Sequence, residues 1–188
     1  ETRPRNAVNL EPAFPGQTRA PEVRAGVAFR TDVVATGLSK PWGMTFLPDG
    51  RLLVTERTTL RIITQNGVVS APVQGVPAVD VGDQGGVHDV VLDPDFANNG
   101  LIYFTFSEPG EAPLTSSAVA RARLTEAGVA PALEDLTIIF SQEPKLDSRQ
   151  HYGGRLAFDR EGPLFVTTGE RYLPVRPPHA PPFARLLG

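Results

Sequence analysis

The sequence predicts an all-β fold, and three observations support this prediction. Gly (18) and Pro (19) together make up about a fifth of the 188 residues, against a usual ~12%, so the chain is rich in turns. The apolar residues occur in short runs, several of which alternate with period two, as strands do. No window long enough for a helix shows a convincing 3.6-residue apolar repeat.

The predicted strands follow one another from residue 29 onward and are separated by turn signals. These signals are Pro48-Asp49-Gly50, Asn66-Gly67, Pro94-Asp95, Asn99-Gly100 and Glu161-Gly162. The segment 124–136 could hold a helical turn, but Gly128 and Pro131 argue against a long helix. Strands are predicted at residues 29–35, 43–47, 51–56, 60–64, 87–92, 101–106, 118–124, 136–140, 154–158 and 164–168.

Three segments share one pattern, and this repeat favours a β-propeller. Each begins with a glycine (Gly43, Gly86 or Gly154) and continues through an apolar strand, a turn rich in Pro, Asp or Gly, and a second apolar strand that ends in Thr or Ser. The starting glycines are 43 and 68 residues apart. An irregular repeat of ~40–50 residues with insertions is typical of propeller blades. A β-sandwich is the alternative, since hairpins look alike in any sheet protein.

The chain divides into three parts in this interpretation. Residues 1–26 are a proline-rich leader without a periodic apolar pattern, residues 27–171 form a partial propeller, and residues 172–188 form a proline-rich tail predicted to be irregular. About 145 residues in the middle part suffice for roughly three blades. Because propellers close at ~4–8 blades, the chain is expected to be part of something longer or to self-associate through open blade edges.

Composition excludes several classes of function. The net charge is −3 and the isoelectric point about 5.6, so no basic surface for nucleic acid is predicted. The chain has no apolar run long enough to span a membrane. Cysteine is absent, which excludes a disulfide framework, a thiolate nucleophile and a Cys-ligated zinc site. The only methionine is Met44, so Glu1 is not a retained initiator and the chain is expected to be processed or a fragment; no signal peptide is visible at the start.

The three histidines differ in their predicted roles. His88 lies within an apolar strand and is predicted to be a buried, hydrogen-bonded structural residue. His151 precedes Tyr152-Gly153-Gly154 and lies on a loop at the inner entrance of a hairpin, where an imidazole could take up a proton. From the residues alone, a solvated loop histidine is still favoured over a catalytic one. His179 lies in the tail and is given little weight.

Two loops were considered as binding sites. The segment 80–86 is glycine-rich without following a Rossmann or P-loop pattern; it could approach a ligand closely or simply be a tight connection. The segment 93–100 faintly resembles a calcium loop, but Ala97 stands at a ligand position and no Glu follows for bidentate binding. A turn is the favoured interpretation of this segment.

Three stretches together resemble the soluble pyrroloquinoline-quinone (PQQ) dependent sugar dehydrogenases, the glucose/sorbosone dehydrogenase family. They are residues 38–57, residues 82–96, and residues 151–159 continued through 167–171, in the order of the family. The Gly-Gly-Arg-Leu sequence at residues 153–156 resembles the aldose sugar dehydrogenase branch. The resemblance implies a six-bladed propeller that carries PQQ and calcium, a sugar substrate, an external electron acceptor, and a periplasmic or secreted location.

The resemblance also implies roles for two residues. His151 falls on the catalytic histidine, the base that takes the C1 hydroxyl proton while a hydride passes to the quinone. Gln84 falls on a glutamine that lines the quinone and substrate pocket. With the resemblance, catalysis becomes the favoured role of His151. The calcium ligands and the cationic quinone-binding residues of the family are expected to lie outside this chain.

Two departures from the family pattern are visible. Gln150 replaces an acidic residue that precedes the histidine in the glucose-specific branch, which puts carboxylate support for the imidazole in doubt. The pattern also ends at Arg171, and the five prolines of the tail predict that it cannot form the next strand; truncation or a changed reading frame would explain this. The alternatives to a dehydrogenase are a non-catalytic binding or scaffold segment, and a fragment that is inactive because its cofactor site is incomplete.

Overall fold

The computed structural model describes residues 9, 11, 13–17, 26–172 and 183–186 of the chain. The chain divides into two compact units, Glu1–Asp32 and Val33–Gly188. The described residues of the first unit contain turns but neither helix nor strand. All strands lie in the second unit, whose boundary falls six residues after the predicted end of the leader.

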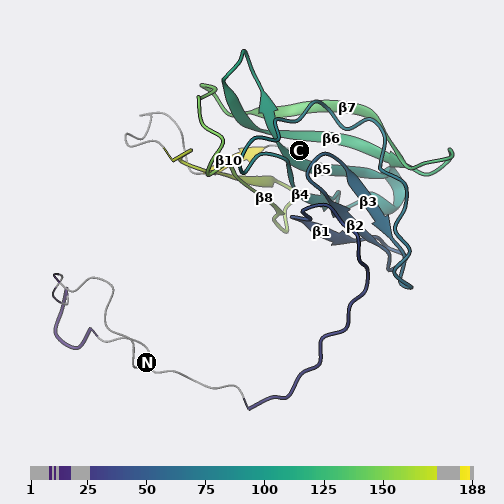
Figure 1. Cartoon of the computed structure of the whole chain (residues 1–188), viewed down its shortest axis with the longest axis horizontal. Helices are drawn as coiled ribbons and strands as arrows, with labels where there is room; N and C mark the ends of the chain where they lie inside the picture. Colours follow the sequence, from purple (N-terminus) through teal and green to yellow (C-terminus); the bar gives the residue numbers. More distant parts are fainter. Residues whose placement is uncertain (1–8, 10, 12, 18–25, 173–182, 187–188) are drawn as a thin grey trace. The chain divides into compact units, whose positions relative to one another are not determined.

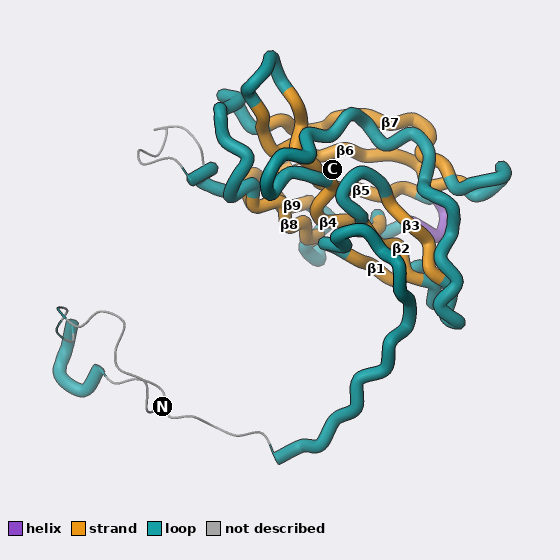
Figure 2. Tube along the Cα trace, in the orientation of Figure 1, coloured by secondary structure: helices purple, strands orange, loops and turns teal. Residues whose placement is uncertain are grey.

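The second unit is built from antiparallel sheets (Figure 1; Figure 2). Its described residues contain one short helix, α1. Three sheets have the strand orders β1-β2-β3, β4-β5-β6-β7 and β10-β9-β8. The elements are β1 Met44–Phe46, β2 Leu52–Thr55, β3 Leu60–Ile63, β4 Val87–Leu92, α1 Phe96–Asn99, β5 Leu101–Pro109, β6 Thr115–Thr125, β7 Ala132–Ser141, β8 Gly153–Phe158, β9 Leu164–Thr168 and β10 Phe183–Leu186.

The three predicted repeats are the opening hairpins of the three sheets. The pairs β1–β2, β4–β5 and β8–β9 are antiparallel, with Phe46 opposite Leu52, Leu92 opposite Ile102, and Phe158 opposite Leu164 at their turns. The first strand of the middle sheet, β4, contacts the first strands of both other sheets. The repeat therefore corresponds to a structural repeat, with the opening strands placed side by side.

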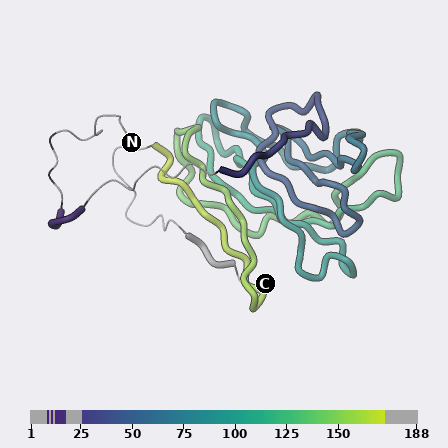
Figure 3. Tube along the Cα trace, turned by 90° about the horizontal axis from the view of Figure 1, so that it is seen from below, coloured from purple at the N-terminus to yellow at the C-terminus, as the bar shows by residue number. Residues whose placement is uncertain are grey.

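The core consists of two layers, one on each face of the middle sheet. Alternate residues of a strand point to opposite faces of its sheet. Consecutive residues are buried along most of β5 and β6, so both faces of these strands are covered. Figure 3 shows the dark-blue β1–β3 segment and the yellow-green β8–β9 hairpin on different sides of the middle sheet. One layer joins this sheet to β1–β3 and includes Leu53, Leu60, Ile62, Val90, Phe104, Phe106 and Ala120. The other joins it to β8 and β9 through Tyr103, Val119, Leu156, Leu164 and Val166.

Two predictions about strands are wrong. Residues 29–35 form no strand, although their apolar residues suggested one. No ladder partner is paired with them among the described residues, and an extended segment without such a partner is not a sheet strand. Phe29 and Val33 are accordingly 88% and 80% exposed.

The second error concerns the tail. Residues 183–186 form β10, which pairs antiparallel with β9, Phe183 opposite Thr167. All five prolines of the tail precede residue 183, so each residue of β10 keeps its backbone donor. The argument from proline therefore does not apply to the four residues that pair.

Within segment 124–136, β6 continues to Thr125 and β7 begins at Ala132, so a hairpin turn replaces the considered helical turn.

Candidate active site

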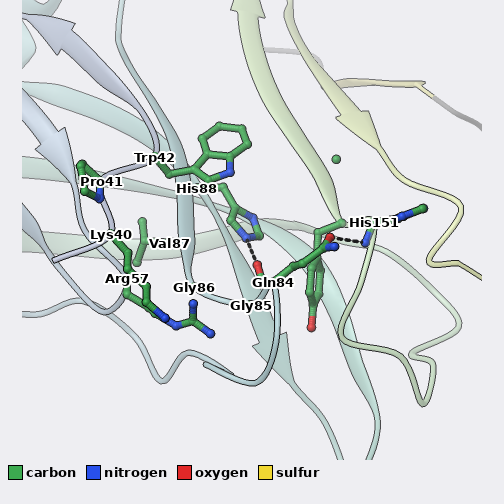
Figure 4. A pocket seen from close by; sticks show the side chains of 12 residues that line it. Lys40, Pro41, Trp42, Arg57, Gln84, Gly85, Gly86, Val87, His88 and His151 are labelled. Atoms are coloured by element: carbon green, nitrogen blue, oxygen red, sulfur yellow. Dashed lines mark hydrogen bonds between the residues drawn. The ribbon is translucent and has the colours of Figure 1, made fainter.

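A cavity of about 420 Å³ opens where the first strands of the three sheets begin. Its walls come from the segment before β1, from the loop that enters β4, and from the loop that enters β8 (Figure 4). Three separate hairpins therefore contribute to one pocket. The lining residues are Lys40, Pro41, Trp42, Arg57, Gln84, Gly85, Gly86, Val87, His88, His151, Tyr152 and Gly153.

Gln84 and His151 meet in this pocket. The backbone N–H of His151 donates to Oε1 of Gln84 at 2.9 Å, and Figure 4 shows this contact as a dashed line. The two residues are 67 positions apart in the chain. Both residues therefore line one pocket.

The imidazole of His151 has a carboxylate partner. Its Nδ1 is hydrogen-bonded to Oε1 of Glu170, which follows β9. A carboxylate can only accept, so Nδ1 carries a proton, and in the neutral form of the ring Nε2 is the nitrogen with the lone pair. The hydrogen bond from His151 holds the pKa of Glu170 below its ordinary value. The ring of Tyr172 packs edge-on against the imidazole, with centroids 5.0 Å apart.

The doubt raised by Gln150 is resolved by this geometry. The Gln150 side chain does not contact the imidazole; its amide donates to Oδ2 of Asp83 at 2.6 Å. The carboxylate next to His151 comes instead from Glu170, nineteen positions later in the chain. The imidazole therefore has a carboxylate partner although the residue before it is a glutamine, because the partner comes from the end of the neighbouring strand of the same hairpin.

His88 is buried and hydrogen-bonded, as predicted. It is 3% exposed, and its Nε2 lies 3.2 Å from the carbonyl oxygen of Gln84. Its ring lies between those of Trp42 and Tyr152, with centroids 5.4 Å from each. In the described part of the chain its Nδ1 has no hydrogen-bond partner, which fits a neutral imidazole protonated at Nε2. His88 also lines the pocket, and this the sequence did not predict.

His88 is expected to make stability depend on pH below about 6.5. Burial lowers its pKa from the ordinary 6.5, although the Gln84 carbonyl opposes this. The unfolded chain therefore binds a proton at a higher pH than the folded chain, so the stabilisation is complete above 6.5 and is lost as pH falls toward the folded pKa.

We expect His88→Phe, which keeps an aromatic ring in the stack, to remove this part of the pH dependence. The slope lost below pH 6.5 is at most ~1.4 kcal/mol per pH unit. Urea titrations at several pH values, followed by the fluorescence of Trp42, the only tryptophan, measure the difference. Equal pH slopes in both proteins would contradict the prediction.

Two cationic residues stand at the opposite wall from His151 (Figure 4). Arg57 donates through Nη2 to the carbonyl oxygen of Asp83 at 2.7 Å and to that of Val81. Lys40 adopts a left-handed backbone conformation with φ 51° and lines the same cavity. The glycine-rich loop 80–86 is thereby tied to the strand end at Arg57, and Gly85 and Gly86 bring its backbone to the pocket. The loop therefore connects two hairpins and also lines the cavity.

No group of three or more His, Cys, Asp or Glu is placed to hold a metal ion within the described ranges. In the calcium-like segment, the Asp93 carboxylate accepts hydrogen bonds from Asn99 Nδ2 at 2.9 Å and Tyr103 Oη at 3.0 Å. The segment turns through α1, which Gly100 ends with φ 64°. The Asp93 carboxylate thus accepts hydrogen bonds from neighbouring side chains of the fold, as expected for a structural turn.

None of the helices in the described part is long and apolar enough to cross a membrane.

Sequence reasoning missed three residues around His151, namely Tyr152, Glu170 and Arg171. Tyr152 is 3% exposed and Arg171 1%. Residues 169–171 lay within the stretch that carried the resemblance, but nothing in the local pattern connected them with residue 151. A polar Gly-Glu-Arg sequence directly after an apolar strand was the available signal, since strand ends commonly position functional side chains.

A family model for glucose/sorbosone dehydrogenases matches residues 38–181. The match extends ten residues beyond Arg171, so the prediction that resemblance ends there is wrong. The Escherichia coli aldose sugar dehydrogenase YliI is 38% identical over 148 residues, which cover 78% of this chain and 39% of that protein. Quinoprotein glucose dehydrogenase B of Acinetobacter calcoaceticus is 29% identical over 177 residues, or 85% of this chain and 36% of that protein. The chain thus spans about two fifths of the length of these relatives.

Solved structures agree with these relationships. The apo-form of the soluble aldose sugar dehydrogenase from Escherichia coli superposes with a TM-score of 0.70 at 40% identity and covers 75% of this chain and 41% of its own. The PQQ-bound aldose sugar dehydrogenase of Streptomyces coelicolor gives a TM-score of 0.66 at 30% identity, with 75% and 41% covered. The antiparallel sheets described above therefore match part of the fold of these two sugar dehydrogenases.

Proposed function

This chain belongs to the glucose/sorbosone dehydrogenase family, and we propose that it takes part in the PQQ-dependent oxidation of aldose sugars at C1. The observation that carries the proposal is the shared pocket of Gln84 and His151, in which a carboxylate holds the imidazole by Nδ1. A relative whose structure contains PQQ supports the choice of cofactor. The geometry of the pocket supports the choice of reaction.

The residues present fit PQQ, a planar quinone that carries carboxylates. Lys40 and Arg57 supply positive charge at one wall, which favours an anionic group. Gly85 and Gly86 line the same pocket with backbone atoms, and Gln84 supplies an amide. We propose that these residues hold part of the cofactor. Calcium belongs to the proposal as well, with its ligands expected outside this chain.

His151 is the proposed general base. Its Nε2 lone pair would accept the proton of the sugar C1 hydroxyl, and the electron pair of the O–H bond would form the C=O bond of the lactone. The hydride that leaves C1 needs an acceptor, and PQQ supplies this two-electron acceptor when it is bound. A base in position is typically worth ~10²–10⁴ in rate.

Glu170 keeps that base in the correct form. Because its carboxylate accepts the Nδ1 proton, the tautomer with a basic Nε2 is favoured, and the positive charge that develops on the imidazole has an anion beside it. The edge-on contact with Tyr172 limits rotation of the same ring. Both interactions hold the imidazole in orientation.

The test uses the longest form of the protein that its gene encodes, which we call the complete protein. It would be loaded with PQQ and calcium and mixed with a panel of aldoses and an artificial electron acceptor. We expect turnover with aldoses that depends on both additions. No turnover with any sugar under these conditions would refute the dehydrogenase assignment.

Glu170→Gln is expected to lower kcat about 10-fold, because the amide oxygen can still accept the Nδ1 proton but the charge-assisted hydrogen bond, roughly twice as strong, becomes a neutral one. KM should change little because the side chain contacts the base and not the proposed sugar position. Steady-state kinetics of the complete protein measure both constants. Glu126→Gln is the matched control, since Glu126 is also an exposed partner of a basic residue, Arg51, and does not line the pocket.

The six-bladed ring remains part of the proposal. Met44 and Phe46 on β1 are 57% and 65% exposed, which supports the idea that another sheet or a second copy packs there. Light scattering of the 188-residue chain tests this, since a stable monomer argues against exposed blade faces.

The rival interpretation, a binding or scaffold segment without catalysis, predicts that substitution of His151 changes no measurable property.

A further inference from the structure

Arg171 is an unusual residue because its charge is buried beside the proposed base. It is 1% exposed and heads the fully buried side chains by volume. Among the ion pairs of the described residues, none includes Arg171. Burial lowers its pKa below the ordinary value. Burying a charge costs several kcal/mol unless hydrogen bonds compensate for the lost water, so the contacts of this guanidinium need an explanation.

The guanidinium is anchored on the middle sheet. Its Nη1 donates to the carbonyl oxygen of Thr115 at 3.2 Å, and its Nη2 donates to the Thr115 hydroxyl at 2.8 Å. Thr115 is the first residue of β6 and 1% exposed. One end of the contact set is therefore fixed in a well-packed strand.

The other contacts go to the loop that carries His151. Nε donates to the carbonyl oxygen of Gln150 at 3.1 Å, and Nη2 donates to that of Ser148. The guanidinium carbon lies 3.9 Å from the centroid of the Tyr152 ring, a cation–π contact. The residues on both sides of His151 are thus held by one planar donor group.

The backbone of Arg171 holds His151 directly. Its N–H donates to the carbonyl oxygen of His151 at 3.3 Å. His151 has φ 49°, a left-handed conformation that costs free energy for a residue with a Cβ atom. Such a conformation persists only where surrounding contacts impose it, and the Arg171 contacts flank it on both sides.

These contacts also reach Gln84. Tyr152, which carries the guanidinium on its ring, contacts the His88 ring at 5.4 Å. His88 Nε2 lies 3.2 Å from the Gln84 carbonyl oxygen, and the Gln84 side chain accepts from the His151 backbone. These contacts lead from Tyr152 through His88 and Gln84 back to the loop of His151. Both proposed site residues, Gln84 and His151, are therefore linked to the buried guanidinium of Arg171.

We propose that Arg171 is a positioning residue, whose buried guanidinium fixes the loop 148–152 and thereby holds His151 in its left-handed conformation at the pocket. This inference rests on the proposed function of His151 for its kinetic consequence. Its conformational consequence is independent of that function and can be measured separately.

The test uses Arg171→Met, which keeps an unbranched side chain without donors, and Arg171→Lys, which keeps the charge but not the planar fork. In the complete protein we expect kcat to fall ~10²-fold, the effect of misplacing a catalytic group by about 1 Å, while KM changes little. In the isotope-labelled 188-residue chain we expect the Cα and Cβ chemical shifts of residue 151 to leave their left-handed values.

Arg51→Met is the matched control. Arg51 donates to Glu126 at 2.6 and 2.7 Å and does not line the pocket, so neither kcat nor the shifts of residue 151 should change. Wild-type kcat and unchanged shifts in folded Arg171→Met, or in Arg171→Lys if the methionine variant does not fold, would overturn the inference. Absence of turnover in the wild-type protein would instead refute the proposed function, and the chemical shifts would still decide the role of Arg171.

Discussion

His151→Asn is expected to lower kcat of the complete protein by ~10²–10⁴, the contribution of a well-placed general base. Asparagine removes the basic nitrogen but tolerates the left-handed conformation of this position. The side chain of His151 is 41% exposed, so the free energy of unfolding should change by no more than about 0.5 kcal/mol. Steady-state kinetics and urea titrations measure the two effects separately.

Asp135→Asn is the control for this substitution. Asp135 has φ 54° and is exposed at a surface pair with Arg123, so it shares the backbone conformation without sharing the pocket. Its variant should retain wild-type kcat. If His151→Asn also retained it, His151 would be a solvated loop residue, and the scaffold interpretation would be favoured.

Gly169→Ala is expected to displace the backbone of His151, because Gly169 packs directly against it. A Cβ atom at Gly169 would lie 1.6 Å from the carbonyl oxygen of His151 and 3.0 Å from the backbone nitrogen of Gly153. Both neighbours are backbone atoms, so the loop itself must move. We expect a loss of ~1–3 kcal/mol in the free energy of unfolding and about a 10²-fold fall in kcat.

Gly128→Ala is the control for Gly169→Ala. A Cβ atom at Gly128 meets only the carbonyl oxygen of Ala130, at an ordinary 3.6 Å, and the residue is exposed in the turn between β6 and β7. Its free energy of unfolding should stay within about 0.5 kcal/mol of wild type. If Gly169→Ala kept the stability and kcat of the wild type, the predicted clash with the backbone of His151 would be wrong.

The hairpins could be predicted from the sequence because their causes are local. Alternating apolar residues and turn signals such as Pro48-Asp49-Gly50 determine a strand pair without reference to the rest of the chain. The same reasoning failed for residues 29–35, since apolar alternation does not supply a partner strand. It failed for residues 183–186 because a count of prolines over the whole tail hid four residues that could still pair.

The site was predictable only in part. His151 and Gln84 were identified through their resemblance to family positions, and the structure brings them into contact. The partners Glu170 and Arg171 were not identified, because their contacts cross a hairpin and join two sheets. His88 was predicted from its apolar strand to be buried, but its place between Trp42 and Tyr152 depends on three segments that no local pattern connects.

We propose that the sugar is oxidised in the pocket of Gln84 and His151. Rapid anaerobic mixing of the PQQ-loaded complete protein with an aldose tests this most directly, with the quinone absorbance followed through a single turnover and no other acceptor present. We expect loss of the quinone absorbance in the wild type and a rate at least ~10²-fold lower in His151→Asn. Equal rates in the two proteins, or a quinone spectrum that no aldose changes, would contradict it.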